Sequence, residues 1–506
     1  MALQPSFLDE ADRHDLVGAI VGRHAPAITT SYAQLRARAE RKARAVAAAN
    51  DQDEVALSTI CDHLHELLLD RVDSDDAAAI ARLAIDTELE LGRSLGRPDP
   101  EALALHHEAR QRGIATAIIT DSSLPCDLVA RIIRSSGFAP DFVVVSSNEG
   151  LRKGSGLYRR LLTMAGVTAD AVVHFGPDQH LDVEVPRRLG IAGHQTRDSM
   201  RHVERLLLGL NRPRGIDSLV LSLARQRLAS TDRLDDEGYG LGYYAAGPLS
   251  VGFCQWLGSI IDRDRPDHLI LCGPAGHLID QMLDIVCPKL AAEERHVLPP
   301  AVDGTCPVDR LAATVPLRDA ERVLVAGLGL FDQPHEHVRQ VLASDGGPTV
   351  TGAYLGLPTA PDRSAEVWAF DDDDQCRLRH AAYRCPEVLE AMLRLLPEAA
   401  QDVSPALRPF HAGGRSIATG ALTFAEDVQP WLHLDERGLS PSVCEPALRV
   451  ITDPTPGEAR ILAPYPVKAD GAEPSRQTLA SPFPGVGGGR RPDRGPGSGL
   501  RPGWGR

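Results

Sequence analysis

The sequence has few aromatic residues, no paired-cysteine motif and no metal-ligand pattern on a predicted helix. Phe, Trp and Tyr make up only 4% of the 506 residues, too few to suggest an aromatic cofactor pocket. Its nine cysteines form no C-x-x-C pair and are odd in number. We therefore expect reduced thiols in a cytoplasmic protein, not a disulfide framework or a zinc site. His63/His65 and His335/His337 are spaced by two, which does not suit one face of a helix.

Long apolar runs and excess positive charge are also missing. No apolar run approaches the ~20 residues needed to cross a bilayer, so no membrane span is predicted. The first residues, "MALQPSFLDEADRHD", have neither a basic start nor an apolar core, which disfavours a signal peptide. The net charge of −15 disfavours a nucleic-acid binder, because phosphate backbones require a positive surface.

Helical and strand patterns alternate along much of the chain. Three stretches within residues 30–95 carry apolar residues at helical spacing, which predicts three helices. From residue 100, apolar runs such as "IATAIIT" (114–120), "FVVVSS" (142–147) and "AVVHFG" (171–176) alternate with amphipathic segments. This pattern predicts a parallel sheet covered on both sides. A second α/β unit follows, with predicted strands at 268–273, 322–329 and 349–357.

Polar residues follow these runs, at the edge where a parallel sheet forms its ligand crevice. Thr120 and Asp121 end the first run, where a hydroxyl and backbone amides can hold a phosphate oxygen. Lys153 precedes a predicted helix, and its ammonium can neutralise phosphoryl charge. Asp178 and Asp182 form an acidic loop of the kind that holds Mg²⁺. These residues predict a phosphate site with a magnesium ion beside it.

Three motifs here resemble those of the haloacid dehalogenase (HAD) superfamily, in the same order: "IITDSSLP", "RKGSGLYRRLL" and "HFGPDQHLDVEVPRRLGI". In addition, "GYYAAGPLSVGFCQWL", followed by a strand and "GHLI", is similar to the second half of large two-part predicted hydrolases associated with bacterial polysaccharide or glycosyltransferase functions. The resemblance covers about residues 1–360. It implies a Rossmann-like parallel sheet (HAD-like) with an inserted helical cap, followed by a second α/β domain.

The resemblance implies phosphoryl transfer through an aspartyl-phosphate. In the family, one Asp attacks phosphorus and a second Asp, two residues later, acts as acid and base. Thr and Lys hold the phosphoryl oxygens, and Mg²⁺ bridges the phosphate to the protein. By this correspondence Thr120, Asp121 and Lys153 bind phosphate, whereas Asp178 and Asp182 bind Mg²⁺.

The nucleophile motif D-x-D of the family is not found in this chain. Where the family reads S-F-D-x-F-D-T, residues 6–12 read S-F-L-D-E-A-D, and no register yields D-x-D. Asp9 and Asp12 are the weak catalytic candidates. Pro177 replaces the first acid of the fourth motif, G-D-x-x-x-x-D. In the second half, residues 274–276 read P-A-G where the relatives have Arg-Asp-Gly.

These losses predict a pseudoenzyme that acts as a binding or regulatory protein for a phosphorylated ligand or partner. The alternative is an active Mg²⁺-dependent phosphatase that uses Asp9 or Asp12 on a small phosphorylated metabolite or sugar phosphate. A third hypothesis is a scaffold for a polysaccharide-assembly partner, which only the resemblance suggests.

Structural roles compete with the functional ones at each candidate residue. Thr120 and Asp121 are typical caps of a following helix, and Asp182 is a candidate N-cap of a helix over 183–189. Lys153 and Asp178 can be solvated charges. The predicted organisation has five parts: a degenerate first strand and loop (1–29), a helical cap (30–99), a HAD-like core (100–200), a second α/β domain (201–465) and a disordered Gly/Pro/Arg-rich tail (466–506).

Overall fold

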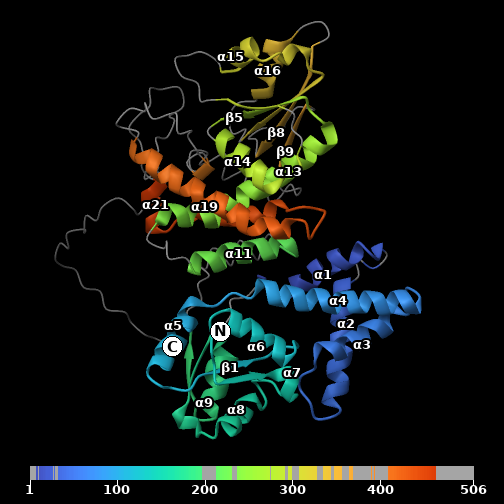
Figure 1. Ribbon diagram of the computed structural model, residues 1–506, viewed down its shortest axis with the longest axis vertical. Coiled ribbons are helices and arrows are strands. Elements are labelled where there is room, and N and C mark those ends of the chain that lie inside the picture. The colour runs from blue at the N-terminus through green and yellow to red at the C-terminus, as the bar shows by residue number, and fades with distance from the viewer. Residues whose placement is uncertain are drawn as a thin grey trace, which may run out of the picture.

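The computed structural model is a mixed α/β structure with parallel sheets (Figure 1). It describes residues 7–9, 11–26, 28, 32–196, 212–230, 236–273, 275–290, 294–298, 307–327, 334–343, 347–355, 364–368, 389, 392–393 and 408–462. Pro274 and the predicted tail 466–506 lie outside these ranges. Within them, no helix combines the length and hydrophobicity that crossing a bilayer requires.

The N-terminal part of the described chain is helical. Its helices are α1 (Asp12–Gly22), α2 (Tyr32–Ala48), α3 (Leu57–Leu68) and α4 (Ser74–Leu95), so the three helices expected between 30 and 95 are confirmed. Asp73 caps α4, because its carboxylate accepts a hydrogen bond from the Asp76 amide. Inside the group, Arg36 of α2 donates two hydrogen bonds to Glu88 of α4, at 2.8 and 3.2 Å. This buried ion pair holds α2 against α4.

The next part alternates helices with short parallel strands, as the sequence predicts. Its main elements are α5 (Pro100–Gln111), β1 (Ala117–Thr120), α6 (Cys126–Ser135), β2 (Phe142–Val145), α7 (Ser146–Glu149), α8 (Leu157–Ala165), β3 (Val173–Gly176), the π-helix η3 (Gln179–Glu184), α9 (Val185–Arg188) and β4 (Ala192–Gln195). The strands pair as β1 with β2 and β3 with β4. The two strand pairs are joined by a cluster of buried side chains. These side chains come from β1, β2 and α8, and from Ile191, the residue before β4.

No strand bridges these two pairs among the described residues, so they form two two-stranded sheets. The sequence resemblance places a first strand near the N-terminus, but residues 7–9 form a bend and residues 12–22 form helix α1. Within the described ranges, one edge of β1 and one edge of β3 therefore have no strand partner. Val173 and Phe175 of β3 are 54% and 44% exposed, which is unusual for apolar strand residues.

The second α/β unit contains one five-stranded parallel sheet, in the order β6-β5-β7-β8-β9. Its strands are β5 (His268–Cys272), β6 (Glu294–Val297), β7 (Arg322–Gly327), β8 (Thr349–Leu355) and β9 (Ala365–Trp368). The three strands expected from the sequence are confirmed as β5, β7 and β8. The two outermost strands, β6 and β9, were not predicted.

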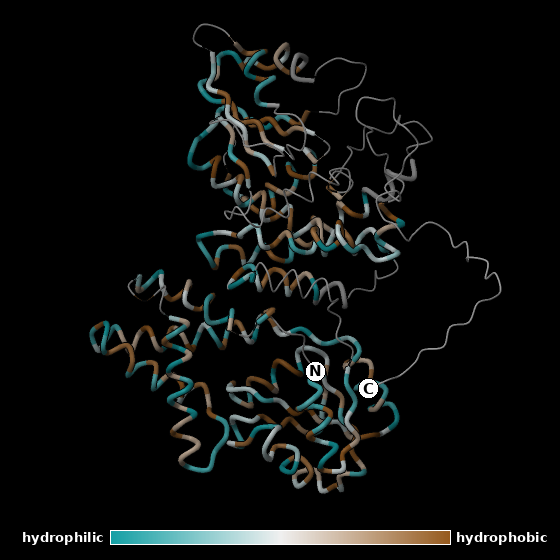
Figure 2. Tube along the Cα trace, turned by 180° about the vertical axis from the view of Figure 1, so that it is seen from behind, coloured by the Kyte–Doolittle hydropathy of each residue, from teal (hydrophilic) through white to brown (hydrophobic). Residues whose placement is uncertain are grey.

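Helices cover both faces of this sheet (Figure 1). Leu269 and Leu271 of β5 pack in one core with α13 (Gly247–Asp264), α14 (Gly276–Val286) and α19 (Arg408–Leu432). On the other face, Ile270 packs in a second core with α15 (Pro307–Thr314) and α16 (Pro334–Leu342). Hydrophobic segments concentrate in the strands and in the helix faces that cover them (Figure 2).

A layer of helices links the two α/β units. It contains α11 (Ile216–Ser230), α12 (Glu237–Leu241), the π-helix η4 (Gly242–Ala246), η8 (Pro441–Cys444), α20 (Glu445–Thr452) and α21 (Pro456–Leu462). Buried residues of α1–α4 belong to the same hydrophobic core as this layer and α13. The N-terminal helices are therefore packed against the second unit as well as connected to the first.

Candidate functional site

The predicted phosphate residues meet at the carboxyl ends of β1 and β3. Thr120 ends β1 and Asp121 follows it, Lys153 precedes α8, and Asp182 lies in η3. The Lys153 ammonium donates to Asp182 Oδ1 at 2.7 Å, and the Lys153 amide donates to Asp121 Oδ1 at 2.8 Å. The fold thus brings together residues that are far apart in the sequence.

Asp182 is the centre of this site and is buried. Besides Lys153, its carboxylate contacts His174 Nε2 at 3.1 Å and accepts from the Asp178 amide at 3.1 Å. Burial alone would raise the pKa of Asp182, but the His174 hydrogen bond and the Lys153 charge outweigh it and hold this pKa well below its usual range. Tyr158, whose hydroxyl donates to the Leu181 carbonyl at 2.9 Å, closes the site from α8. Asp182 is therefore a fixed carboxylate anion that holds the Lys153 ammonium.

A glycine makes room for this carboxylate. A Cβ atom built on Gly176, the last residue of β3, would lie 2.4 Å from Asp182 Cγ. Real side chains do not approach this closely, so any larger residue at 176 displaces Asp182. The glycine of the motif thus has a steric role.

Asp121 differs from Asp182 because one of its oxygens is free. Oδ1 accepts from the Lys153 amide, whereas Oδ2 is buried without a hydrogen-bond partner in the described part of the chain. The nearest cation is Arg152, whose Nε lies 3.8 Å from Oδ2. Burial raises the pKa of Asp121, although the Lys153 amide and ammonium oppose the shift. Asp121 Oδ2 is therefore a buried carboxylate oxygen with spare bonding capacity.

The helical part also supplies a residue to this edge. The Asp53 amide donates to the Gly150 carbonyl at 2.9 Å, and the Leu57 amide donates to the Ser123 carbonyl at 2.8 Å. Between these anchors, Glu54 is buried, with Arg152 at 3.5 Å and Ser146 Oγ at 3.3 Å. Sequence reasoning missed Glu54, because it lies in a turn between two helices and belongs to no motif.

The structure decides between several of the competing roles. Asp178, not Asp182, is the N-cap of the helical segment that begins with η3, and its carboxylate accepts from the Leu181 amide at 2.7 Å. Thr120 and Asp121 do not cap the next helix, since α6 begins after Pro125 and has no side-chain cap. Lys153 is not a solvated charge, because its side chain is only 15% exposed and is paired.

The magnesium ion expected at Asp178 and Asp182 stays a prediction. Both oxygens of Asp182 already accept hydrogen bonds, and the Lys153 ammonium lies where a cation would bind that carboxylate. Asp178 is exposed and uses Oδ1 as a cap. In this arrangement the donor set does not fit Mg²⁺, which prefers several oxygen ligands and water in an octahedron.

Asp9 and Asp12 lie at a different place. The Asp9 amide donates to Asp12 Oδ2 at 3.3 Å, and the neighbouring Leu8 amide donates to Ser218 of α11 at 2.9 Å. None of the hydrogen bonds described for this bend and for α1 involves Lys153 or Asp182. Figure 1 shows α1 beside α4 and α11, away from β1. The structure therefore does not bring either weak catalytic candidate to the phosphate residues.

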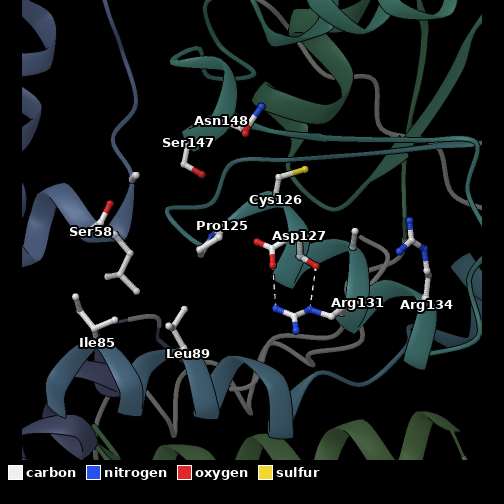
Figure 3. Close-up of a pocket in the computed structure, with 13 residues that line it drawn as sticks. Ser58, Ile85, Leu89, Pro125, Cys126, Asp127, Arg131, Arg134, Ser147 and Asn148 are labelled. Carbon is white, nitrogen blue, oxygen red and sulfur yellow. Dashed lines mark hydrogen bonds and ion pairs between the residues drawn. The ribbon is translucent and has the colours of Figure 1, made fainter. Parts of the chain in front are cut away.

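A groove of about 1020 Å³ lies between the N-terminal helices and the first α/β unit (Figure 3). Ile85 and Leu89 of α4 form one wall, and Cys126 and Arg131 of α6 form the other. Arg131 is bound to Asp127 of its own helix at 2.9 Å, and burial raises the pKa of the Cys126 thiol. The lining includes none of Thr120, Asp121, Lys153 and Asp182, so the groove is separate from the phosphate residues.

Compared with models of known protein families, the chain matches none, and no curated protein is significantly similar to it.

Proposed function

We propose that this protein binds a phosphorylated ligand at Lys153 and Thr120 without hydrolysing it, and that it acts as a binding or regulatory protein. The observation that carries the proposal is the Lys153–Asp182 pair, in which a buried carboxylate holds a half-buried cation at the carboxyl edge of two parallel strand pairs. A lysine ammonium has three donors, and its contact with Asp182 uses one. The remaining donors and the Thr120 hydroxyl are available for phosphoryl oxygens.

The absence of hydrolysis is supported by how the carboxylates of Asp182, Asp9 and Asp12 are used. Asp182 accepts from Lys153 and the Asp178 amide, so its oxygens are engaged. Asp9 and Asp12 bond with the segment around α1. A carboxylate nucleophile requires an oxygen directed at phosphorus, and neither group meets this requirement. The three HAD-like motifs add to this reading, since they retain the phosphate-holding positions, whereas the D-x-D nucleophile motif is not found in the sequence.

Calorimetric titration of the full chain with inorganic phosphate and with a sugar phosphate tests binding. We expect a saturable heat for at least one of these ligands, with or without Mg²⁺. Lys153→Met should abolish it, whereas Lys289→Met, an exposed lysine of the second unit, should leave it unchanged. Equal binding by the two variants would refute a role for Lys153, and no binding by the native chain would refute the proposal.

One observation favours an active Mg²⁺-dependent phosphatase instead, namely the free Oδ2 of Asp121. A phosphatase screen separates the two functions. Turnover that Asp121→Asn abolishes would make Asp121 the nucleophile, and turnover that Asp9→Ala or Asp12→Ala abolishes would restore the alternative predicted from the sequence. We expect no turnover in the native chain.

A further inference from the structure

The amino ends of β5 and β6 carry a cluster of three potential metal ligands, His268, Glu294 and His296. It lies in the second α/β unit, apart from every residue used in the proposed function. Strands β5 and β6 are parallel, with His268 opposite Glu294 and Ile270 opposite His296. Because alternate residues of a strand share a face, Glu294 and His296 point to the same side of the sheet.

The contacts of the intervening residue show which side this is. Arg295 lies between the two ligands in sequence and contacts Asp280 and Asp284 of α14. The cluster therefore lies on the opposite face, which α15 and α16 cover. His268 is buried, and Glu294 is 58% exposed at its side chain, so the cluster sits at the border of the core with solvent.

The spacing of the ligand atoms fits a tetrahedral metal ion. His268 Nδ1 lies 3.1 Å from His296 Nε2 and 3.4 Å from Glu294 Oε2, and the third separation, His296 Nε2 to Glu294 Oε2, is 3.8 Å. Bonds of about 2.0–2.1 Å from a tetrahedral zinc ion place its ligand atoms roughly 3.3–3.4 Å apart. An ion fits among these three atoms with shifts of a few tenths of an ångström.

We propose that His268, Glu294 and His296 bind a zinc-type divalent cation, with water as the fourth ligand. Two imidazoles and one carboxylate suit zinc and similar transition metals, whereas Mg²⁺ and Ca²⁺ prefer all-oxygen sites. The ion ties the outer strand β6 to β5. The competing arrangement is a direct hydrogen bond between the imidazoles of His268 and His296, which does not require the Glu294 carboxylate.

Cobalt titration of the chelator-treated full chain tests this site. We expect one equivalent of Co²⁺ to give visible d–d absorption without a thiolate charge-transfer band, and Zn²⁺ to remove the absorption. His296→Gln should weaken binding by at least about 100-fold, beyond the 10–100-fold typical of residues that only support a ligand. Glu294→Gln alters an exposed side chain, so it tests the site with little risk to folding, and should weaken binding by at least about 10-fold.

His277→Gln is the matched control, because His277 lies on the neighbouring helix α14 and is not in the cluster. Its cobalt spectrum and affinity should equal those of the native chain. Circular dichroism verifies that each variant is folded. A folded native chain without d–d absorption, or one whose binding both Glu294→Gln and His296→Gln leave unchanged, would overturn the proposal in favour of the hydrogen bond alone.

Discussion

The two α/β units use similar βα alternation but reach different degrees of completeness. In the second unit, β5 is buried at every position and has a strand on each side. In the first, β1 and β3 each have one strand partner among the described residues, and β3 exposes Val173 and Phe175. Charged residues at the carboxyl ends of the strands, by contrast, are found in the less complete unit. Lys153 and Asp182 occupy the carboxyl edge of the incomplete unit, while the described residues directly after β5 (Gly273, Ala275 and Gly276) are uncharged.

This difference indicates that one unit supplies most of the stability and the other carries the polar site. A strand buried on both faces contributes most of its free energy through apolar packing. A half-covered strand contributes less, but its end remains open to polar groups. We therefore expect the second unit to dominate the free energy of unfolding and the first to carry ligand binding.

The largest expected effect tests this division directly. Leu271→Ala in β5 removes a fully buried side chain and should lower the free energy of unfolding by about 2–5 kcal/mol. Val173→Ala in β3 alters an exposed side chain and should change it by less than about 0.5 kcal/mol. Urea unfolding followed by circular dichroism measures both. Similar losses for the two variants would contradict the comparison.

A buried carboxyl group in the linking layer should make stability depend on pH. Asp217 of α11 accepts hydrogen bonds from the Ser440 amide at 3.0 Å and from the Ser442 hydroxyl at 2.9 Å, and burial raises its pKa from 3.8 to about 6. The folded state binds the Asp217 proton more tightly than the unfolded state does. The contribution of Asp217 to the free energy of unfolding therefore falls as pH rises from 3.8 to about 6. The fall amounts to about 3 kcal/mol.

Asp217→Asn keeps a similar shape and cannot ionise, so it should remove this decline. The test compares the free energy of unfolding of the variant and the native chain at pH values from 3.8 to about 6. A difference between the two that does not change with pH would show that Asp217 does not titrate as described.

A smaller effect is expected at the contact between the N-terminal helices and the first unit. Glu54→Gln removes the negative charge that Arg152 and Arg44 approach, and should cost about 1–3 kcal/mol. Glu66→Gln, in the exposed pair with Lys42, is the control and should leave the free energy of unfolding nearly unchanged. Hydrogen exchange of the Asp53 and Leu57 amides should quicken only in Glu54→Gln. Unchanged exchange there would refute an anchoring role for Glu54.

The smallest effect separates capping from metal binding at Asp178. Asp178→Ala removes the hydrogen bond to the Leu181 amide and should cost about 1 kcal/mol. Asp178→Asn retains the cap and should cost close to nothing. The two variants should be compared with and without Mg²⁺. If Asp178→Asn were as unstable as Asp178→Ala when Mg²⁺ is present, but not when it is absent, the carboxylate would be a metal ligand instead.

The sequence predicts strands best where they are buried. Continuous apolar runs identify β5, β7 and β8, whereas β6 reads "ERHV" and β9 reads "AEVW", which alternate or mix polar and apolar residues. Both lie at the outer edges of the sheet, and one-sided burial does not require an apolar run. The sequence does not show which strands lie at the edges of the sheet, because strand order depends on the tertiary structure.

The candidate site follows the same rule. The meeting of Asp121, Lys153 and Asp182 could be predicted, because strand order alone directs these loops to one edge. Glu54 could not, since its contact depends on how a distant helical segment docks. The His268–Glu294–His296 cluster was missed because spacing rules for one helix do not describe two paired strands, whose register brings together residues 26 and 28 positions apart.

The close approach of Gly176 to Asp182 has a consequence for tolerance to mutation. Position 176 has no side chain and no charge, yet a methyl group there would push away the carboxylate that holds Lys153. In a saturation screen for ligand binding, even Ala at 176 should score as poorly as the loss of the lysine itself. An inspection restricted to polar side chains would overlook this residue, although the empty space beside its Cα determines where the ammonium lies.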